Sequence, residues 1–205
     1  MCQVVPSIAG VAVRTTARNP RRAAVEAQVL EATEALLAGG ASYGELKIEQ
    51  IASRAGISRP AFYFYFRDKR DLLMRLTADV ADLLYAEAEA WWSGDGPDDL
   101  EPALRSVLAL YQDHAMLLRA VVETAAIDEE VAAFWRALVA RFVDATRRRL
   151  EAERPELPAH ETAFALSWMT ERTCYQHYVQ GGTLDDDGLV RALVGIWTRA
   201  VYGNV

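Results

Sequence analysis

Five consecutive aromatic residues, Phe62 to Phe66, lie within the stretch GISRPAFYFYFRDK. As a strand, this run would favour aggregation, because aromatic residues prefer sheets and the run carries no charge. As a helix that begins at Ser58, a good N-cap, the run divides into two faces because each residue advances by about 100°. We therefore expect a helix over residues 58–66, with Phe62 and Phe66 in the core and Tyr65 at its border.

The opposite face of this expected helix carries side chains that can bind DNA. The guanidinium group of Arg59 can donate two hydrogen bonds to guanine, and the hydroxyl group of Tyr63 can reach a phosphate oxygen. Phe64 and Pro60 can pack against thymine methyl groups. The alternative is that Tyr63 and Phe64 are buried against another part of the chain. The residues expected to contact DNA are Lys47, Ser58, Arg59, Pro60, Ala61, Tyr63, Phe64, Tyr65 and Lys69.

The placement of the lysines supports this interpretation. The chain has 20 arginines but only two lysines, Lys47 and Lys69, and both lie at the start of an expected helix. A cation at that position opposes the helix dipole. A bound phosphate would account for it, because free backbone N–H groups and an ammonium group can converge on one oxygen. Coincidence is the alternative explanation.

A catalytic or metal-binding role is the main alternative class of function. The three histidines are His114, His160 and His177, and Cys174 precedes the last of them by three residues, which allows a thiol–imidazole pair on a helix. No second ligand pair at a suitable spacing accompanies them, and the sequence has no Gly-rich phosphate loop. We therefore expect no catalytic residue, metal or cofactor. A helical interaction module or small-molecule-binding protein that does not bind DNA is the third possibility.

The elements that position these residues are expected to be helices. Apolar residues recur at helical spacing, and turn signals such as SGDGPDD, RPELP and QGGTLDDD separate the helical segments. Outside the aromatic run we find no alternating strand pattern, so we expect an all-α protein of about nine helices. The first expected helix begins at Arg21, and the others cover about 47–55, 58–66, 69–91, 100–112, 115–125, 129–152, 159–180 and 186–202.

Charge is distributed unevenly along the 205 residues. Residues 1–76 carry eleven Lys and Arg against seven Asp and Glu, whereas residues 77–205 carry eleven against 22. A basic N-terminal part suits a polyanionic partner, and an acidic remainder limits how much of the surface can lie on it. We expect a flexible basic arm over residues 1–20, a DNA-binding domain over 21–76 and a second domain over 77–205.

The composition is that of an ordinary globular protein, with 52% hydrophobic and 25% charged residues. No apolar stretch approaches the ~18 residues that a membrane-spanning helix needs. The two cysteines, Cys2 and Cys174, lie far apart, which argues against a disulfide framework. We therefore expect a cytoplasmic protein with no membrane partner.

The segment LKIEQIASRAGISRPAFYFYFRDKRDLL resembles the DNA-binding signature of the TetR family of bacterial transcriptional regulators. The family often has Gly at the position of Pro60 and a hydroxyl residue at that of Lys47. The resemblance implies a helix-turn-helix whose second and third helices read double-stranded operator DNA, a homodimer, and an effector pocket in the body over 77–205. The matching positions are Ile51-Ala52, Ala55-Gly56-Ile57-Ser58, Tyr63, Tyr65-Phe66, Lys69 and Leu72-Leu73.

Within that family, SRPAFYFYF, LPAHETAFALSWMTERT and IWTRAVYG resemble the ethionamide-type repressors. This resemblance spans both halves of the chain and implies a repressor released from its operator by a small hydrophobic effector. In those relatives the positions of Ser167 and Thr170 carry amides, so this chain would offer smaller hydroxyl groups. Ordinary core packing is the alternative for each pocket residue. The pocket implied by the resemblance is lined by Tyr111, Trp135, Phe142, Ser167, Thr170, Tyr175 and Trp197.

The last two helices are expected to form the dimer. Leu189, Leu193, Ile196 and Ala200 make an apolar stripe suited to a four-helix interface between two subunits. Such an interface would hold two reading heads at about 34–36 Å, the spacing of successive major grooves on one face of DNA. Burial of the stripe within one subunit is the alternative.

Overall fold

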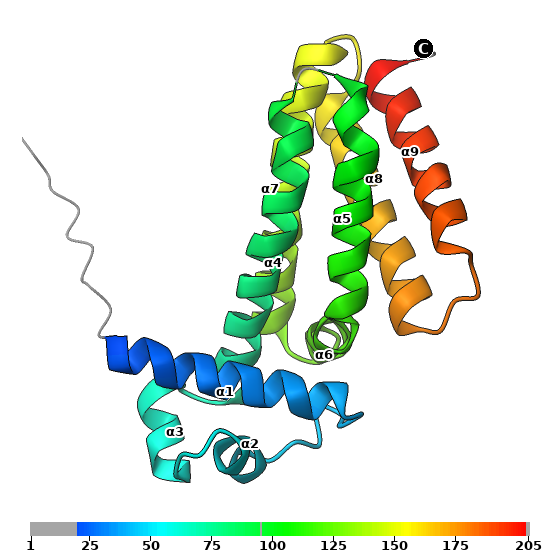
Figure 1. Cartoon of the computed structure of the whole chain (residues 1–205). Helices are drawn as coiled ribbons and strands as arrows, with labels where there is room; N and C mark the ends of the chain where they lie inside the picture. The colour runs from blue at the N-terminus through cyan, green and yellow to red at the C-terminus, as the bar shows by residue number, and fades with distance from the viewer. Residues whose placement is uncertain (1–19, 95, 204–205) are drawn as a thin grey trace, which may run out of the picture.

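The computed structural model describes residues 20–94 and 96–203, which form helices and connecting turns with no strand among them. Three helices, α1 to α3, lie below an upright bundle, and the long helix α4 passes from one to the other (Figure 1). The prediction of an all-α protein is therefore confirmed. The arm expected over residues 1–20 lies almost wholly outside the described residues. No helix within the described ranges is long and apolar enough to cross a membrane.

The lower part, which we call the head, consists of α1 (Pro20–Ala38), α2 (Ile48–Arg54) and α3 (Arg59–Tyr65). The chain leaves α1 through Gly40 and α2 through Gly56, whose φ angles are 90° and 69°. Residues that carry a Cβ atom rarely adopt this left-handed backbone conformation, so glycine allows the chain to turn sharply at the end of each helix. The α2–α3 pair with its short turn is the helix-turn-helix expected from the sequence.

The core of the head is built on the inner side of the aromatic run. Phe62 and Phe66 are fully buried, and their ring centroids lie 5.4 Å apart. Phe66 follows the last residue of α3 in an extended conformation, yet its ring remains on the same inner side. The two rings pack in one cluster with Val29 of α1 and with Leu72 and Leu73 of α4. This confirms that the aromatic run has two faces.

Helix α4 (Lys69–Ser93) connects the head to the body. The Asp68 carboxylate caps its first turn by accepting a hydrogen bond from the Asp71 N–H at 2.8 Å. Its lower part contributes Leu72 and Leu76 to the head core, and its upper part contributes Trp91 to the core of the body. A movement of α4 would therefore displace residues in the core of the head and in the core of the body.

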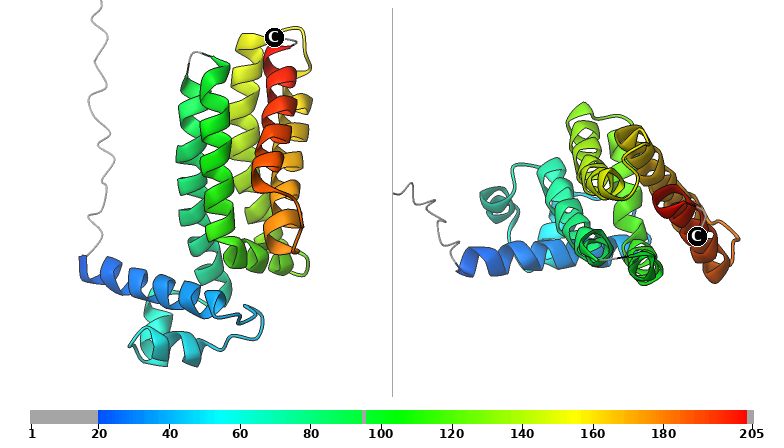
Figure 2. Two further views of the ribbon diagram at one scale, coloured as in Figure 1. Left: turned by 45° about the vertical axis from the view of Figure 1, so that its right-hand side comes forward. Right: turned by 90° about the horizontal axis from the view of Figure 1, so that it is seen from above.

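The upper part, which we call the body, is a helical bundle. Four of its helices run side by side with α4, whereas α6 crosses the base of the bundle next to the head (Figure 2). The core of the head continues into α6 through Leu117 and Val121, and into the next helix through Val131. Besides two short segments, 3-10 helical Pro97–Asp99 and π-helical Tyr175–Val179, the body consists of α5 (Leu100–Asp113), α6 (Ala115–Ala125), α7 (Glu129–Glu153), α8 (Ala159–Cys174) and α9 (Asp186–Tyr202).

One expected helix is interrupted. The sequence predicts a single helix over residues 159–180, but α8 ends at Cys174 and a π-helical turn follows. The Gln180 N–H donates to the Tyr175 carbonyl at 3.1 Å, five residues back rather than four. The wider turn comprises Tyr175–Val179, within the segment that the sequence predicts to be one regular helix.

Candidate DNA-reading helix and effector cavity

The outer face of α3 is exposed to solvent. The side chain of Phe64 is 70% exposed and that of Tyr63 is 46% exposed, while Arg59 and Pro60 are also exposed. The alternative in which Tyr63 and Phe64 are buried elsewhere in the same chain is therefore wrong. Tyr65 is half-buried, as expected for a residue at the border of the core. Arg59, Pro60, Tyr63 and Phe64 are therefore accessible to a binding partner.

The start of α3 is fixed by local hydrogen bonds and by one ion pair. The Ser58 hydroxyl caps the helix by accepting from the Ala61 N–H at 3.2 Å. The Arg59 guanidinium lies 3.0 Å from the Glu49 carboxylate of α2, and both side chains are more than half exposed. Solvent weakens such a pair, so Arg59 can exchange Glu49 for another hydrogen-bond acceptor at little cost.

The α1 helix also contributes to this region. The Arg22 guanidinium lies 5.6 Å from the centre of the Phe64 ring and 5.8 Å from that of Tyr65. Its Nε atom lies 2.9 Å from the Glu26 carboxylate one turn later. Sequence reasoning does not single out Arg22, although it lies in the basic run NPRR at the start of α1. Arg22 adds a positive charge beside the outer aromatic face.

The two lysines differ in their surroundings. Lys47 is exposed immediately before α2. Lys69 instead donates from its ammonium group to three backbone carbonyls in the loop before α2, those of Tyr43 at 2.6 Å, Gly44 at 3.2 Å and Leu46 at 2.6 Å. An ammonium group has three donors, so a phosphate contact by Lys69 would require one of these bonds to break. All three donors of Lys69 are therefore occupied in the structure, and the DNA contacts expected of Lys47 and Lys69 both stay predictions.

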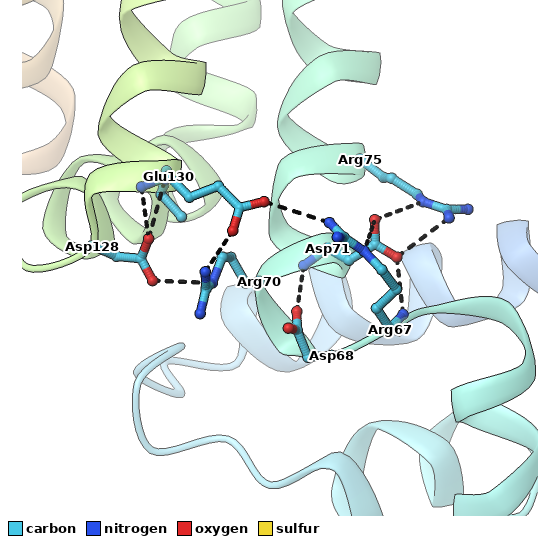
Figure 3. Close-up of polar contacts among 8 residues, drawn as sticks. Arg67, Asp68, Arg70, Asp71, Arg75, Asp128 and Glu130 are labelled. Carbon is cyan, nitrogen blue, oxygen red and sulfur yellow. Dashed lines mark hydrogen bonds and ion pairs between the residues drawn. The ribbon is translucent and has the colours of Figure 1, made fainter.

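A group of ion pairs connects the head to the start of α7 (Figure 3). Arg70 lies 3.0 Å from the Asp128 carboxylate and 2.6 Å from that of Glu130. Arg67 lies 3.5 Å from Glu130, and its backbone N–H donates to Asp71 at 3.0 Å. Asp128 also caps α7 by accepting from the N–H of Glu130 at 3.0 Å. The first turns of α4 and α7 are therefore tied together.

The body encloses an apolar cavity between α4, α5, α7, α8 and α9. The cavity brings together Tyr111, Trp135, Phe142, Ser167, Thr170 and Trp197, which are six of the seven residues expected to line a pocket. Two further tryptophans, Trp91 and Trp92 of α4, complete an aromatic wall. The use of this cavity by an effector stays a prediction.

Tyr175 is the expected pocket residue that the structure places elsewhere. It follows α8 in the π-helical turn, where its hydroxyl accepts from the Gln180 amide at 3.2 Å and its ring lies 4.9 Å from the Arg172 guanidinium. Tyr175 is absent from the cavity wall, which its neighbour Cys174 lines. The expectation for Tyr175 is thus wrong.

The polar groups at the cavity wall fall into two kinds. The Thr170 and Thr146 hydroxyls accept hydrogen bonds from the Trp197 and Trp92 indoles at 2.9 and 3.2 Å. Ser167 and Glu171, by contrast, each have a buried oxygen with no hydrogen-bond partner. Sequence reasoning does not include Glu171. The sequence could have indicated Glu171 through its spacing, because it lies four residues after Ser167 and therefore on the same face of the helix.

The expected dimer stripe on α9 is mostly internal. Leu189 and Leu193 are buried in the core of the body, so they do not lie on the outer surface. They share an inward face with Trp197 and Val201, as helical spacing dictates. Ile196 is 42% exposed and Ala200 is partly buried. The expectation for Leu189 and Leu193 is therefore wrong.

An exposed apolar surface nevertheless lies on the last two long helices. Phe164 of α8 is 52% exposed, and its ring lies 6.2 Å from that of Trp168. Together with Ile196 of α9, these residues leave aromatic and aliphatic groups in water. Groups of this kind are typical of protein–protein contact sites.

The cysteine and histidine considered as a catalytic pair are not arranged for that chemistry. Burial raises the pKa of the Cys174 thiol to about 12, which disfavours a thiolate. The His177 Nε2 atom lies 2.7 Å from the Asp186 carboxylate, so this ring joins the π-helical turn to the start of α9. Among the described residues, no group of three or more His, Cys, Asp or Glu could hold a metal ion.

A helix-turn-helix head on a separate helical body defines a DNA-binding transcription regulator. Residues 29–76 match the family described as "Bacterial regulatory proteins, tetR family", and residues 100–203 match "Transcriptional regulator EthR, C-terminal domain". The second match covers just over half of the chain. The chain therefore belongs to the TetR family of transcriptional regulators, with a C-terminal domain of the EthR type.

The relatives support this assignment. The HTH-type transcriptional regulator EthR of Mycobacterium tuberculosis H37Rv is 29% identical over 171 residues, 78% of this chain and 79% of that protein. EthR of Mycolicibacterium smegmatis is 29% identical over 195 residues, 88% of this chain and 87% of that protein. These relatives are regulators and not enzymes, which agrees with the prediction of no catalytic activity.

Solved structures show the same fold. A TetR-like transcriptional regulator from Rhodococcus sp. RHA1 has a TM-score of 0.68 and 24% identity, covering 91% of this chain and 100% of its own. AibR in complex with isovaleryl coenzyme A and operator DNA has a TM-score of 0.65 and 17% identity, covering 88% of this chain and 100% of its own. At these identities the likeness concerns the fold alone.

Proposed function

We propose that this regulator is a homodimeric, cytoplasmic repressor that binds operator DNA and is released by a small hydrophobic effector. The outer face of α3 carries the proposal. A largely exposed aromatic side chain, Phe64, lies there beside Arg59 and Tyr63. A DNA groove would cover the ring and would supply acceptors for the guanidinium and hydroxyl groups.

Two helices provide a physical connection between the head and the cavity. Helix α4 places Leu72 in the head core and Trp91 at the cavity wall, and α7 places Glu130 beside Arg70 and Trp135 at the cavity wall. An effector that binds better when the heads are splayed lowers operator affinity by its ratio of affinities for the two states. A tenfold preference in each subunit would give roughly a hundredfold change, about 2.7 kcal/mol, if the dimer switches as a unit.

The first experiment identifies and measures the operator. Genomic fragments retained by the protein would be sequenced, and binding of a labelled fragment would be followed by fluorescence anisotropy. We expect the affinity to fall by orders of magnitude between about 50 and 200 mM salt, because several phosphates are engaged. Salt-insensitive retention, or no sequence preference, would favour a small-molecule-binding protein that does not use DNA.

Two variants then test the assignment of the head. Arg59→Ala is expected to cost about 1–3 kcal/mol on the preferred operator and to relax the preference at one base pair. Lys47→Ala is expected to weaken binding to all duplexes alike and to reduce the salt slope by about 1. Arg148→Ala removes an exposed positive charge near the far end of α7 and serves as the control. If Arg59→Ala behaved like this control, α3 would not be the reading helix.

A further inference from the structure

Two buried oxygen atoms on residues that line the cavity lack a hydrogen-bond partner within the described part of the chain. The Glu171 Oε2 and Ser167 Oγ atoms are buried and have no hydrogen-bond partner among the described residues. The two side chains lie four residues apart on α8 and both line the cavity. Only 8% of the Glu171 side chain is exposed. A buried polar group without a partner is costly, so this pair calls for a group that arrives with a ligand.

The protein compensates Glu171 only weakly. The Tyr111 hydroxyl donates to the other carboxylate oxygen, Oε1, over a long 3.5 Å, and Arg172 lies 3.7 Å from Oε2 with its side chain half exposed. Removal from water outweighs both contacts and raises the pKa of the Glu171 carboxyl above its usual range. A cation placed against Oε2 would offset this cost and stabilise the carboxylate.

The walls of the cavity also favour a cation. Four tryptophans line it, together with Phe142 and Tyr111. Aromatic faces attract ammonium groups, and Trp does so most strongly. Among the described lining residues there is no Lys, Arg or His, so the cavity wall offers an anionic group no cationic partner. The Thr170 and Thr146 hydroxyls already accept from the Trp197 and Trp92 indoles, which leaves the Glu171 and Ser167 oxygens as the unpaired acceptors for a ligand.

We propose that the effector is a lipophilic amine, whose ammonium group binds Glu171 Oε2 and Ser167 Oγ while its apolar part lies between the tryptophans. The inference names the chemical class of ligand that the cavity binds. It rests on the proposed function only because it calls this ligand an effector. It distinguishes this chain from a regulator with an acyl-coenzyme A effector, which carries several negative charges.

Three probes that share one apolar body test the proposal. Binding of 4-phenylbutylamine, 4-phenylbutan-1-ol and 4-phenylbutanoate to the full chain without DNA would be measured by calorimetry and by quenching of tryptophan fluorescence at pH 7. We expect the amine to bind at least tenfold more tightly than the alcohol, and the alcohol more tightly than the carboxylate. Equal or tighter binding of the alcohol or of the carboxylate, or no binding of the amine, overturns the proposal.

Variants locate the amine. Glu171→Gln is expected to weaken amine binding at least tenfold while changing alcohol binding less than twofold, and Ser167→Ala to weaken it severalfold. Glu87→Gln makes the same chemical change at an exposed position of α4 and is the control. An unchanged amine affinity in Glu171→Gln overturns the assignment. These measurements contain no DNA, so failure of the amine series leaves operator binding standing, and failure of operator binding leaves the amine series valid.

Discussion

The ammonium group of Lys69 binds three backbone carbonyls of the loop before α2, and burial lowers the pKa of this group. The Tyr43 hydroxyl returns a hydrogen bond to the Lys69 carbonyl. The side chain therefore fastens the loop that positions α2 against the start of α4. Its presence at a helix start, where a cation opposes the dipole, is accounted for by these three acceptors.

Replacement of Lys69 by Met tests this internal role. We expect the free energy of unfolding to fall by about 1–3 kcal/mol, because the partly buried carbonyls lose their donors. Urea unfolding followed by circular dichroism would measure the loss. Lys47→Met removes the other lysine from an exposed position and should change stability by less than about 0.5 kcal/mol. Equal stability of the two variants would show that the Lys69 contacts contribute nothing to folding.

Residue patterns predict some parts of the candidate site better than others. The outer position of Arg59, Tyr63 and Phe64 follows from helical spacing, since Phe62 and Phe66 fix the inner side. Glu171 is different, because an isolated acidic residue is normally expected in solvent. Its burial depends on the closure of five helices around the cavity, which no local pattern of residues contains.

Helix boundaries follow closely from the sequence because capping residues are local. Asp68, Asp128 and Asp185 each accept a backbone N–H in the first turn of the next helix. The end of α8 is an exception. No Gly or Pro marks the change to a π-helical turn after Cys174, so the sequence pattern predicts one continuous helix through it.

The ion pairs between α4 and α7 predict an effect on DNA binding from outside the reading helix. Glu130→Gln breaks the contacts of Glu130 with Arg70 and Arg67, which frees the head relative to the body. We expect operator affinity to fall two- to fivefold, equivalent to about 0.4–1 kcal/mol, because the freed head loses more conformational freedom on binding. Fluorescence anisotropy with the operator fragment would measure it.

The direction of the change in operator affinity distinguishes an electrostatic effect from the loss of the ion pairs. Removing an acidic charge strengthens DNA binding by electrostatics alone, so a weakened complex points to loss of the contacts between α4 and α7. Glu129→Gln removes the same charge from the preceding residue, which forms an ion pair with Arg136 within α7. We expect this control to bind the operator as tightly as the unmodified protein, or more tightly. Tighter binding by Glu130→Gln would contradict a role for these ion pairs.

At the scale of the whole molecule, the two parts of the chain differ in charge. Residues 1–76 carry the excess of positive charge that attracts DNA, and the acidic remainder disfavours contact with the duplex. A single short reading helix contacts few base pairs, so specific binding in this class of protein uses two heads on two half-sites. A dimer joined through the exposed apolar residues of α8 and α9 would supply the second head, and this interface stays a prediction.

An apolar stripe in a sequence does not indicate whether its residues are covered by the same chain or by a second copy. Leu189 and Leu193 are covered by their own chain, whereas Phe164 and Ile196 remain exposed on adjacent helices. Leu193 and Ile196 lie three residues apart on one helix and both fit its apolar period, so periodicity alone cannot assign one to the core and the other to an interface. The tertiary packing of α9 decides between them.

Replacing Ile196 by Glu tests whether this surface forms the dimer. A charge placed in an apolar interface is costly to desolvate, so we expect light scattering after size-exclusion chromatography to change from dimer to monomer. Operator affinity should fall at least tenfold, because the two heads no longer bind as one unit. Leu83→Glu, at an exposed apolar residue of α4, is the control and should remain dimeric. If Ile196→Glu stayed dimeric while Leu83→Glu became monomeric, the subunits would meet on the α4 side of the bundle, and the spacing of the two heads would have to be set by α4 itself.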